Sequence, residues 1–294
     1  MSKPKIICVV GPTASGKTGY AIKLAKEQGG EVVSCDSMQI YKEMTIGTAK
    51  PTREEMQGIP HHMLDFVDPA ENYSVADFVT DAKRCIDDIL FRGNLPILCG
   101  GTGLYVDSVI NGITFSDDAR DDAYRQELKE LAEQQGVDAV HALLKEADPQ
   151  AAEQIHPNNV KRVIRTLEII KTSGMSKADY DRAARQEPCY DATIYGMDWE
   201  REELYRRIDL RVDLMMEQGL LKEVKHLLEL GIPKSATSMQ AIGYKELVAY
   251  LEEHSTLEEA VETIKRESRR YAKRQLTWFR RNRNIIWIKP EEMA

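Results

Sequence analysis

The chain has 294 residues, of which 42% are hydrophobic and 30% charged, and its formal net charge at pH 7 is −8. These values are typical of a globular protein with one large or two modest domains, and they exclude a uniformly basic nucleic-acid-binding protein. The sequence contains no run of about 18 apolar residues, and Met1 is followed almost at once by an apolar strand pattern. We therefore expect a cytoplasmic protein without a signal peptide or a membrane segment.

Residues 6–10 form a continuous apolar run, which is typical of a parallel strand covered on both faces. The next eight residues match the phosphate-loop pattern G-x-x-x-x-G-K-[ST] at every fixed position: Gly11, Pro12, Thr13, Ala14, Ser15, Gly16, Lys17 and Thr18. Backbone N–H groups of such a loop, together with the start of the following helix, bind a di- or triphosphate. We expect Lys17 to reach between phosphate oxygens and the Thr18 hydroxyl to hold Mg²⁺.

A second strand is predicted over residues 31–35, and it ends directly before Asp36. Ligands bind at the carboxyl ends of the strands in doubly wound sheets, so we expect Asp36 to face the phosphate loop across a crevice. This makes Asp36 the strongest catalytic candidate, although a turn or helix-capping role is the alternative for an aspartate at a strand end. Residues 41–60 are loop-like and end at His61 and His62, for which local structure is favoured over a metal site.

The middle of the chain predicts a helix over residues 74–90, with Ser74 as N-cap and Asp77 completing a capping box. A third strand over residues 95–99 follows. Many phosphate-loop hydrolases carry an Mg²⁺-binding acid at the end of such a strand, but this strand ends in Gly-Gly-Thr-Gly. Activation of water for hydrolysis is therefore disfavoured. The glycines permit close backbone approach to a ligand, with the Thr102 hydroxyl available to it, or they form an ordinary strand-to-helix turn.

From about residue 115 the pattern changes to charged, one-sided helices, expected over residues 124–135, 137–146 and 159–171. We interpret residues 116–191 as a small all-helical insertion domain within a discontinuous phosphate-loop core of residues 1–115 and 192–294. The insertion carries a basic segment, residues 161–165, which could hold phosphates or form a solvated helix face. The overall expectation is an α/β fold with a parallel sheet flanked by helices, as in phosphate-loop NTPases.

The last third predicts a strand over residues 192–197, a helix over 201–216, a loop-like stretch over 234–244, a helix over 257–282 and a closing strand over 285–288. Arg207 and Arg211 lie one turn apart, which favours a bound anion, although Glu203 could offset their repulsion equally well. Residues 265–283 contain nine basic side chains against one acid, interleaved with aromatic residues. That pattern suits a nucleic-acid backbone with base stacking, while the aromatic side chains could equally be core.

Five segments in register resemble the tRNA dimethylallyltransferase family, and the likeness covers essentially the whole length. The segments are 11–18 (GPTASGKT), 36–41 (DSMQIY), 46–51 (IGTAKP), 100–105 (GGTGLY) and 205–208 (YRRI). Members of that family transfer a dimethylallyl group from dimethylallyl diphosphate to N6 of adenosine 37 in tRNAs that read codons beginning with U. The resemblance implies a monomer that binds dimethylallyl diphosphate, Mg²⁺ and the anticodon stem-loop of tRNA.

The resemblance also implies roles for single residues. Asp36 would be the general base for N6, Thr102 and Arg207 would hold the diphosphate or line the channel, and Gln39 would read the flipped-out base. Which of Arg206, Arg207 and Arg211 contacts diphosphate stays open. The implied tRNA contacts are Asp36, Ser37, Met38, Gln39, Thr102, Tyr124, Lys161, Arg162, Val163, Ile164, Arg165, Gln240 and Lys245.

Two other functions are compatible with the phosphate loop. A kinase acting on a nucleoside or small metabolite could use Asp36 as the base for a hydroxyl, but it would not need a basic, aromatic C-terminal helix. A regulatory nucleotide switch is disfavoured by the missing acid after the third strand. The five cysteines lack C-x-x-C spacing and favour reduced, buried thiols over a disulfide or zinc site.

Overall fold

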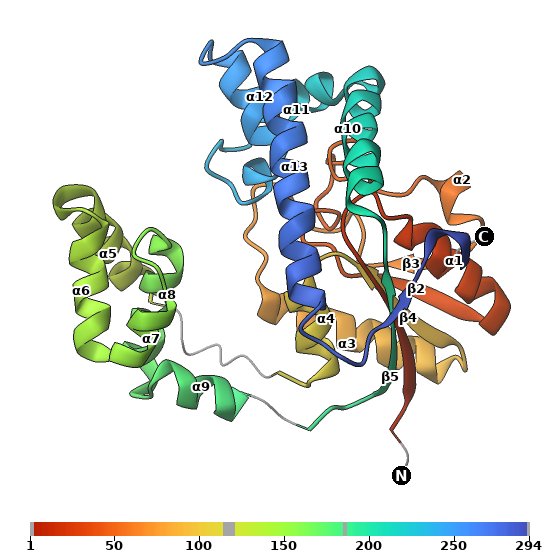
Figure 1. The fold of residues 1–294 in the computed structure, drawn as a ribbon, viewed down its shortest axis with the longest axis horizontal. Coiled ribbons are helices and arrows are strands. Elements are labelled where there is room, and N and C mark those ends of the chain that lie inside the picture. The colour runs from red at the N-terminus through yellow and green to blue at the C-terminus, as the bar shows by residue number, and fades with distance from the viewer. Residues whose placement is uncertain (1–2, 114–120, 185–186, 293–294) are drawn as a thin grey trace. The chain divides into compact units, whose positions relative to one another are not determined.

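The computed structural model describes residues 3–113, 121–184 and 187–292. The chain forms two compact units, one made of Met1–Ile110 with Pro188–Ala294 and the other of Asn111–Glu187. Figure 1 shows the elements of both units along the chain. No helix within the described ranges is both long and apolar enough to span a lipid bilayer.

The larger unit is built on a six-stranded sheet in the order β3-β2-β4-β1-β5-β6, and every neighbouring pair is parallel. The strands are β1 (Lys5–Val10), β2 (Gly30–Ser34), β3 (His61–His62), β4 (Leu95–Gly100), β5 (Asp191–Met197) and β6 (Ile286–Ile288). This confirms the predicted α/β class. Because β2, β4 and β1 are adjacent and parallel, the segments that follow them, which begin at Cys35, Gly101 and Gly11, meet at one edge.

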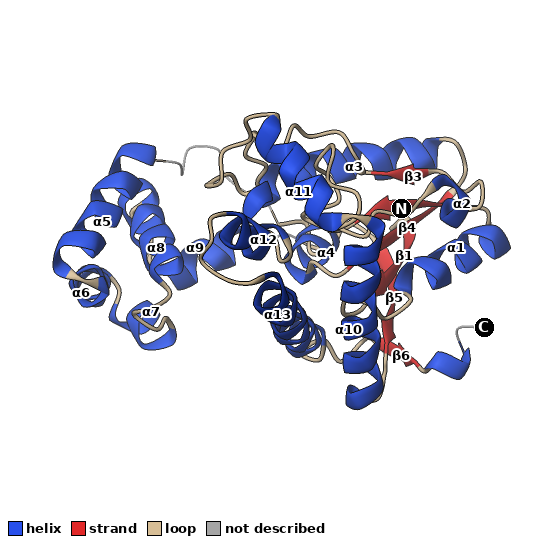
Figure 2. Cartoon of the chain, turned by 90° about the horizontal axis from the view of Figure 1, so that it is seen from above, coloured by secondary structure: helices blue, strands red, loops and turns tan. Residues whose placement is uncertain are grey.

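Helices cover both faces of the sheet. α1 (Lys17–Gln28) packs through Ala21 and Leu24 on the face that carries Val9 and Ile97. α3 (Val75–Phe91) and α4 (Gly103–Ile110) lie on the other face, and Figure 2 shows α1 and α4 on opposite sides of the strands. α3 begins with the predicted capping box, because Ser74 and Asp77 bond to each other's backbone N–H groups.

The C-terminal part adds a helical layer beside the sheet, formed by α10 (Arg201–Gln218), α11 (Leu220–Glu229), α12 (Tyr244–Leu251) and α13 (Leu257–Phe279). These helices share an apolar core with the loop after β2, including Met44, Val212, Leu220, Tyr244 and Ile264. The larger unit also contains three short helical turns: α2 (Arg53–Met56), Ser238–Gln240 and Pro290–Glu292. The predicted loops 41–60 and 234–244 therefore each contain one short helical turn.

The smaller unit is helical throughout its described part, as predicted: α5 (Asp122–Gln135), α6 (Val137–Ala147), α7 (Pro149–Gln154), α8 (Val160–Ser173) and α9 (Lys177–Ala184). It has its own apolar core, centred on Leu128, Leu144 and Leu167. The Glu168 carboxylate is buried in this unit and is neutralised by Arg125 at 2.7 Å and by Arg165. The unit therefore contains both an apolar core and a buried ion-pair network of its own.

Candidate active site

The phosphate loop follows β1 and leads into α1, as its pattern predicts. Gly16 adopts a left-handed conformation with φ 81° at the start of the helix, which a side chain would disfavour. Lys17 folds back so that Nζ donates to the Pro12 carbonyl at 3.3 Å, and burial lowers the pKa of its ammonium group. The Ser15 hydroxyl oxygen is buried and has no hydrogen-bond partner among the described residues, so the loop offers an unsatisfied polar group to an anion.

Three side chains from the C-terminal part hold three successive residues of this loop. Gln275 accepts the Thr13 N–H at 2.9 Å, Arg207 Nε donates to the Ala14 carbonyl at 3.0 Å, and Trp199 Nε1 donates to the Ser15 carbonyl at 2.9 Å. The Arg207 guanidinium also stacks over the Trp199 ring at 4.2 Å. Sequence reasoning placed Arg207 at the phosphate site but missed Trp199 and Gln275.

The three candidate arginines of α10 differ in their surroundings. Arg206 is exposed and pairs with Glu203 at 2.7 Å, so we remove it from the candidates for diphosphate binding. Arg211 lies beside Asp36 and has no hydrogen-bond partner within the described part of the chain. Burial lowers the pKa of the Arg211 guanidinium, and the Asp36 charge opposes that shift. Of these three, Arg207 and Arg211 therefore remain the candidates for binding an anion at the site.

Asp36 has both of the roles considered for it. Its Oδ1 accepts the N–H groups of Met38 at 2.9 Å and Gln39 at 3.3 Å, as a turn aspartate does, and the residue also lines a cavity. Thr102 is brought to the same place from β4, because its hydroxyl oxygen accepts the Ser37 N–H at 3.2 Å. The carboxylate, the hydroxyl and the phosphate loop thus meet at the carboxyl edge of the sheet.

This cavity, of about 330 Å³, lies entirely within the larger unit, and we refer to its polar and apolar lining residues as its polar wall and its apolar wall. The polar wall contains Thr13, Asp36, Ser37, Arg211, Tyr271 and Arg274. The apolar wall contains Met38, Ile208, Val212, Met215, Leu220, Ile242 and Ile264. Burial, reinforced by the Asp36 charge, raises the pKa of Tyr271 to about 12, so its hydroxyl stays protonated at neutral pH.

The glycines at positions 100, 101 and 103 leave room for neighbouring segments to pack closely against the chain. A Cβ at Gly100 would lie 2.2 Å from the Cys35 carbonyl oxygen, and one at Gly101 would lie 2.1 Å from Gln275 Nε2. At Gly103 it would lie 2.3 Å from the Trp278 ring. These glycines therefore allow close packing of β2 and α13 against the turn, which favours the structural interpretation of the segment.

Among the predicted tRNA-contacting residues, the Gln39 side chain is already occupied. Its Nε2 donates to the Thr48 and Ala49 carbonyls, each at 3.1 Å, and its Oε1 accepts from Ser34 at 3.1 Å. A primary amide has only two N–H donors and both are used here, so Gln39 would have to exchange these bonds to read a base, and that role stays a prediction. Met38, Gln240 and Lys245 do line the cavity.

In the smaller unit, the residues predicted to contact tRNA differ in their exposure. Val163 and Ile164 are 1% and 5% exposed within its apolar core, so their side chains have no surface to offer RNA. They face inward because they belong to the buried stripe of α8. Lys161 and Arg162 are exposed, whereas Arg165 pairs with Glu168. Tyr124, whose ring lies 4.0 Å from the Lys171 ammonium, is half-buried.

No cluster of three or more histidine, cysteine or acidic side chains that could hold a metal occurs in the described residues. His62 bonds to Glu31 at 2.6 Å and His61 to the Ile59 carbonyl at 2.8 Å, which confirms local structure for this pair. The Thr18 hydroxyl at the phosphate loop is compatible with Mg²⁺, because Mg²⁺ is commonly bound by one or two protein oxygens together with phosphate oxygens and water.

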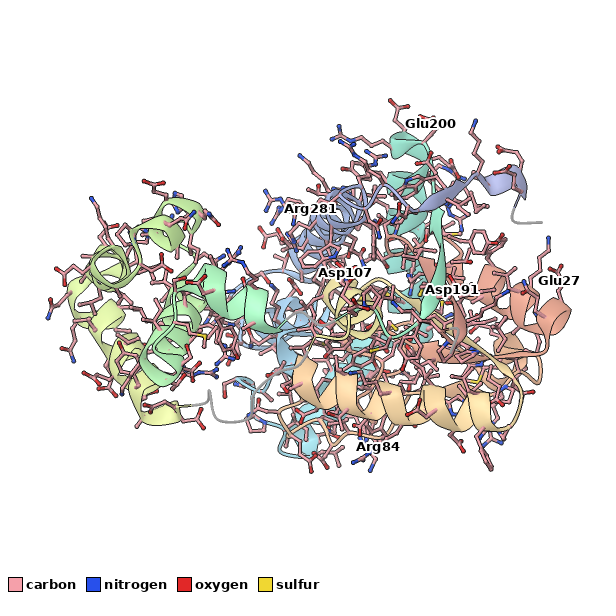
Figure 3. The ribbon with its side chains drawn as sticks, turned by 90° about the horizontal axis from the view of Figure 1, so that it is seen from below. Glu27, Arg84, Asp107, Asp191, Glu200 and Arg281 are labelled. Carbon is pink, nitrogen blue, oxygen red and sulfur yellow. The ribbon has the colours of Figure 1, made fainter. Side chains whose placement is uncertain are left out.

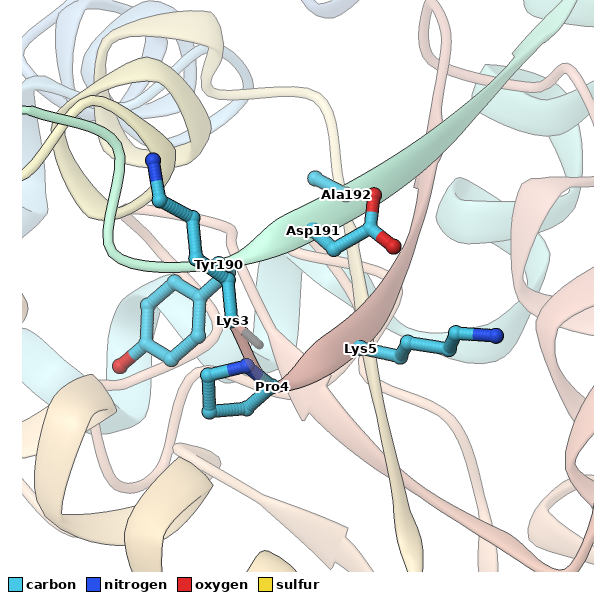
Figure 4. Close-up of a pocket in the computed structure, with 6 residues that line it drawn as sticks. All are labelled: Lys3, Pro4, Lys5, Tyr190, Asp191 and Ala192. Atoms are coloured by element: carbon cyan, nitrogen blue, oxygen red, sulfur yellow. The ribbon is translucent and has the colours of Figure 1, made fainter. Parts of the chain in front are cut away.

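A second hollow, of about 660 Å³, lies at the amino ends of β1 and β5 (Figure 4). It is lined by Lys3, Pro4, Lys5, Tyr190, Asp191 and Ala192. Parallel sheets bind ligands at the opposite edge, where the strands end, and the phosphate loop lies there. The smaller cavity beside Asp36 is therefore the candidate active site.

The fold is of the parallel α/β class, and its cavity is lined by a carboxylate together with Thr13 of the segment that matches the phosphate-loop pattern. A family model described as IPP transferase matches residues 39–282. A tRNA dimethylallyltransferase of Bacillus anthracis is 52% identical over 98% of this chain and 91% of its own length. The chain belongs to the IPP transferase family.

Two solved structures support this assignment. A full-length tRNA isopentenylpyrophosphate transferase from Bacillus halodurans is 50% identical, with a TM-score of 0.74 over 98% of this chain and 90% of its own. A eukaryotic dimethylallyltransferase acting on tRNA is 32% identical, with a TM-score of 0.83 over 97% of this chain and 74% of its own. The fold is therefore shared with tRNA-modifying relatives along nearly the whole chain.

Proposed function

We propose that this chain is a tRNA dimethylallyltransferase. It transfers the dimethylallyl group of dimethylallyl diphosphate to N6 of adenosine 37, in tRNAs that read codons beginning with U. Family membership supports transfer to tRNA. The observation that carries the proposal for the chemistry is that one cavity is lined by both Asp36 and Thr13 of the phosphate loop. The tRNA substrate would place the enzyme, acting as a monomer, in the cytoplasm.

The proposed reaction breaks the bond between C1 of the dimethylallyl group and the diphosphate oxygen, and it forms a bond between C1 and N6. The diphosphate leaves with the electron pair, and its growing negative charge is stabilised by loop N–H groups, Lys17 and Arg207. Asp36 accepts the N6 proton as the C–N bond forms, which assists an amine that is a poor nucleophile because its lone pair is delocalised into the adenine ring. An adenine flipped out of the stacked loop can reach this carboxylate.

The lining of the cavity supports the same substrates. The polar wall, with Arg211 and Arg274, suits a diphosphate or RNA phosphate, whereas the aliphatic wall suits a prenyl chain or the face of a base. Exclusion of water by that wall would protect an allylic carbocation-like centre from hydrolysis. Mg²⁺ held by the Thr18 hydroxyl and diphosphate oxygens would neutralise leaving-group charge.

The general base is tested with Asp36→Asn. Asparagine keeps the oxygen that accepts the Met38 and Gln39 N–H groups, so the turn is retained, but it cannot take the N6 proton. We expect transfer of labelled dimethylallyl groups to tRNA to fall by about 10²- to 10⁴-fold, while tRNA binding is retained. Asp68→Asn is the matched control, because exposed Asp68 makes the same kind of turn with Ala70 at 2.9 Å.

The kinase alternative is tested in parallel. Dimethylallyl diphosphate should raise the melting temperature more than ATP does at equal concentration, because the tighter ligand stabilises the folded state more. Transfer of the terminal phosphate of labelled ATP to a nucleoside, without dimethylallyl transfer to tRNA, would instead support the kinase. Equal melting shifts with ATP and dimethylallyl diphosphate would contradict the proposed ligand preference.

A further inference from the structure

Gln275 joins two loops that come from different strands. The residue lies in α13 and is 6% exposed. Its Oε1 accepts the Thr13 N–H at 2.9 Å, and its Nε2 donates to the Gly101 carbonyl at 3.0 Å. Only an amide offers an acceptor and a donor at this fixed spacing, so neither glutamate nor methionine can make both bonds.

The contact with Gly101 is unusually close. A Cβ at that position would lie 2.1 Å from Gln275 Nε2, so only glycine leaves room for the amide. The next residue, Thr102, accepts the Ser37 N–H beside Asp36. Tyr271, one turn before Gln275 in α13, lies close to both Thr102 and Gln275, whose polar groups lower its pKa against the effect of burial. The amide therefore connects the phosphate loop on one side with the Asp36 side of the cavity on the other.

This connection matters because the strands that carry the two halves of the site are not neighbours. The phosphate loop follows β1 and Asp36 follows β2, and β4 lies between them in the sheet. Their relative placement therefore depends on the turn after β4, where Gln275 bonds to Gly101. Group transfer requires the reacting atoms to be held within about 3–3.5 Å, and a misplacement of about 1 Å can lower the rate by about 10²-fold.

We infer that Gln275 is a positioning residue, which holds the phosphate loop and the Asp36–Thr102 side of the cavity in one fixed arrangement. The inference rests on the proposed transferase function for its consequence in catalysis. Gln275 acts through Thr13 and Gly101 rather than on the substrates. Its loss should therefore lower the rate of transfer between bound substrates more than it weakens the binding of either one.

The first test uses Gln275→Met, which keeps the length of the side chain and loses both hydrogen bonds. We expect kcat with both substrates saturating to fall by about 10- to 100-fold. The Kd values for tRNA and for dimethylallyl diphosphate, measured separately, should each change by less than about threefold. Gln275→Glu keeps the acceptor for the Thr13 N–H, so its kcat should lie between those of Gln275→Met and the wild type. Gln218→Met, at the exposed end of α10, is the control and should leave all of these values unchanged.

A double-mutant cycle tests the link to Gly101 directly. Gly101→Ala should displace the Gln275 amide and lower kcat as Gln275→Ala does. With alanine already at position 275 the clash with the amide is gone, and the added methyl group keeps only a 3.3 Å contact with the Gly11 carbonyl oxygen, so the double variant should be no slower than Gln275→Ala alone. Losses that multiply in the double variant would show that the two residues act independently, and would overturn the inference.

Two further outcomes would also overturn it. One is an unchanged kcat in Gln275→Met. The other is a parallel loss of melting temperature, both affinities and kcat, which would indicate a general structural role. Wild-type transfer to tRNA, measured in the same assay, reports on the proposed function separately, because the inference is judged from the ratio of variant to wild type.

Discussion

The Tyr244 hydroxyl donates a 2.6 Å hydrogen bond to the Glu223 carboxylate. That carboxylate also accepts three successive backbone N–H groups at 2.7–3.1 Å, those of Thr45, Ile46 and Gly47. Gly47 lines the cavity, and a Cβ there would lie 2.5 Å from the Tyr244 ring. Helices α11 and α12 therefore fix one wall of the active site through a single carboxylate.

We predict that Glu223→Ala is much more damaging than Tyr244→Phe. Removing the carboxylate leaves three loop N–H groups without their acceptor, which should destabilise the fold by about 3 kcal/mol or more, whereas losing the hydroxyl should cost about 1–2 kcal/mol. The loosened wall should also raise KM for tRNA in Glu223→Ala. Urea unfolding and steady-state kinetics measure both effects, and Glu229→Ala, exposed on the same helix, is the control. Equal destabilisation by both substitutions would refute the prediction.

Arg207→Lys should weaken the binding of dimethylallyl diphosphate. Lysine keeps the charge but lacks the planar group that stacks on Trp199 and the Nε that bonds to Ala14. We expect KM for the diphosphate to rise by about 10- to 100-fold, which corresponds to loss of a charge-assisted hydrogen bond. Arg206→Lys, on the exposed side of the same helix, should leave KM unchanged. A rise in Arg206→Lys equal to that in Arg207→Lys would mean that general charge, not this contact, is responsible.

The stability of the fold should depend on pH through Glu31. Burial alone would raise the pKa of this carboxyl, but hydrogen bonds from Arg92, Asn94 and His62 lower it to about 2. A lowered carboxyl pKa stabilises the fold above the unfolded value near 4.5, and this contribution is lost as the pH falls from there toward 2. Glu31→Gln should therefore be less stable by about 2–3 kcal/mol at pH 7.

The difference between wild type and Glu31→Gln should narrow steadily below about pH 4.5. Denaturant unfolding at a series of pH values measures it. Glu27→Gln is a suitable control, because Glu27 is exposed at the end of α1 (Figure 3). If the difference in unfolding free energy between Glu31→Gln and wild type stays constant down to pH 3, Glu31 contributes through packing rather than through its charge.

The affinity for tRNA should fall as the salt concentration rises. The dependence should be weaker than expected if all nine basic side chains of residues 265–283 contacted phosphates. Five of them are within 4 Å of an acid, as in the pairs of Lys265 with Asp213 at 2.7 Å and Arg269 with Asp209. The other four are Lys273, Arg274, Arg281 and Arg283. If these contact phosphates, a plot of log Kd against log salt should have a slope of about 3.

Single substitutions can identify the contributing residues. Lys273→Gln and Arg283→Gln should each reduce that slope by about 1. Arg270→Gln should change it less, because Arg270 is already paired with Glu267 at 2.7 Å. If tRNA binding by the wild-type protein does not depend on salt, α13 is not part of the RNA interface.

The sequence was most informative where local rules decide the structure. Apolar runs located β1, β2, β4 and β5, and the phosphate-loop pattern located residues 11–18 at the edge where Asp36 and Thr102 also lie. The capping box at Ser74 fixed the start of α3. Each of these features depends on neighbours within a few positions, so composition and spacing are enough to predict it.

Contacts between distant segments could not be predicted in the same way. Gln275 lies within a basic stretch and resembled a surface residue, yet it is buried against two loops. Phe279 is 2% exposed and Trp278 donates to Asp107 at 2.7 Å, so these aromatics belong to the fold rather than to a base-stacking surface. Only the packing of α13 on α4 reveals these roles.

The bond between Thr13 and Gln275 spans 262 positions of the chain. A ribosome that has completed β1 and the phosphate loop has therefore made a segment that still lacks one of its hydrogen-bond partners, because Gln275 belongs to α13. Nascent chains and products truncated before α13 should be unable to capture the diphosphate. We therefore expect the phosphate loop to reach its final arrangement only after α13 has been made.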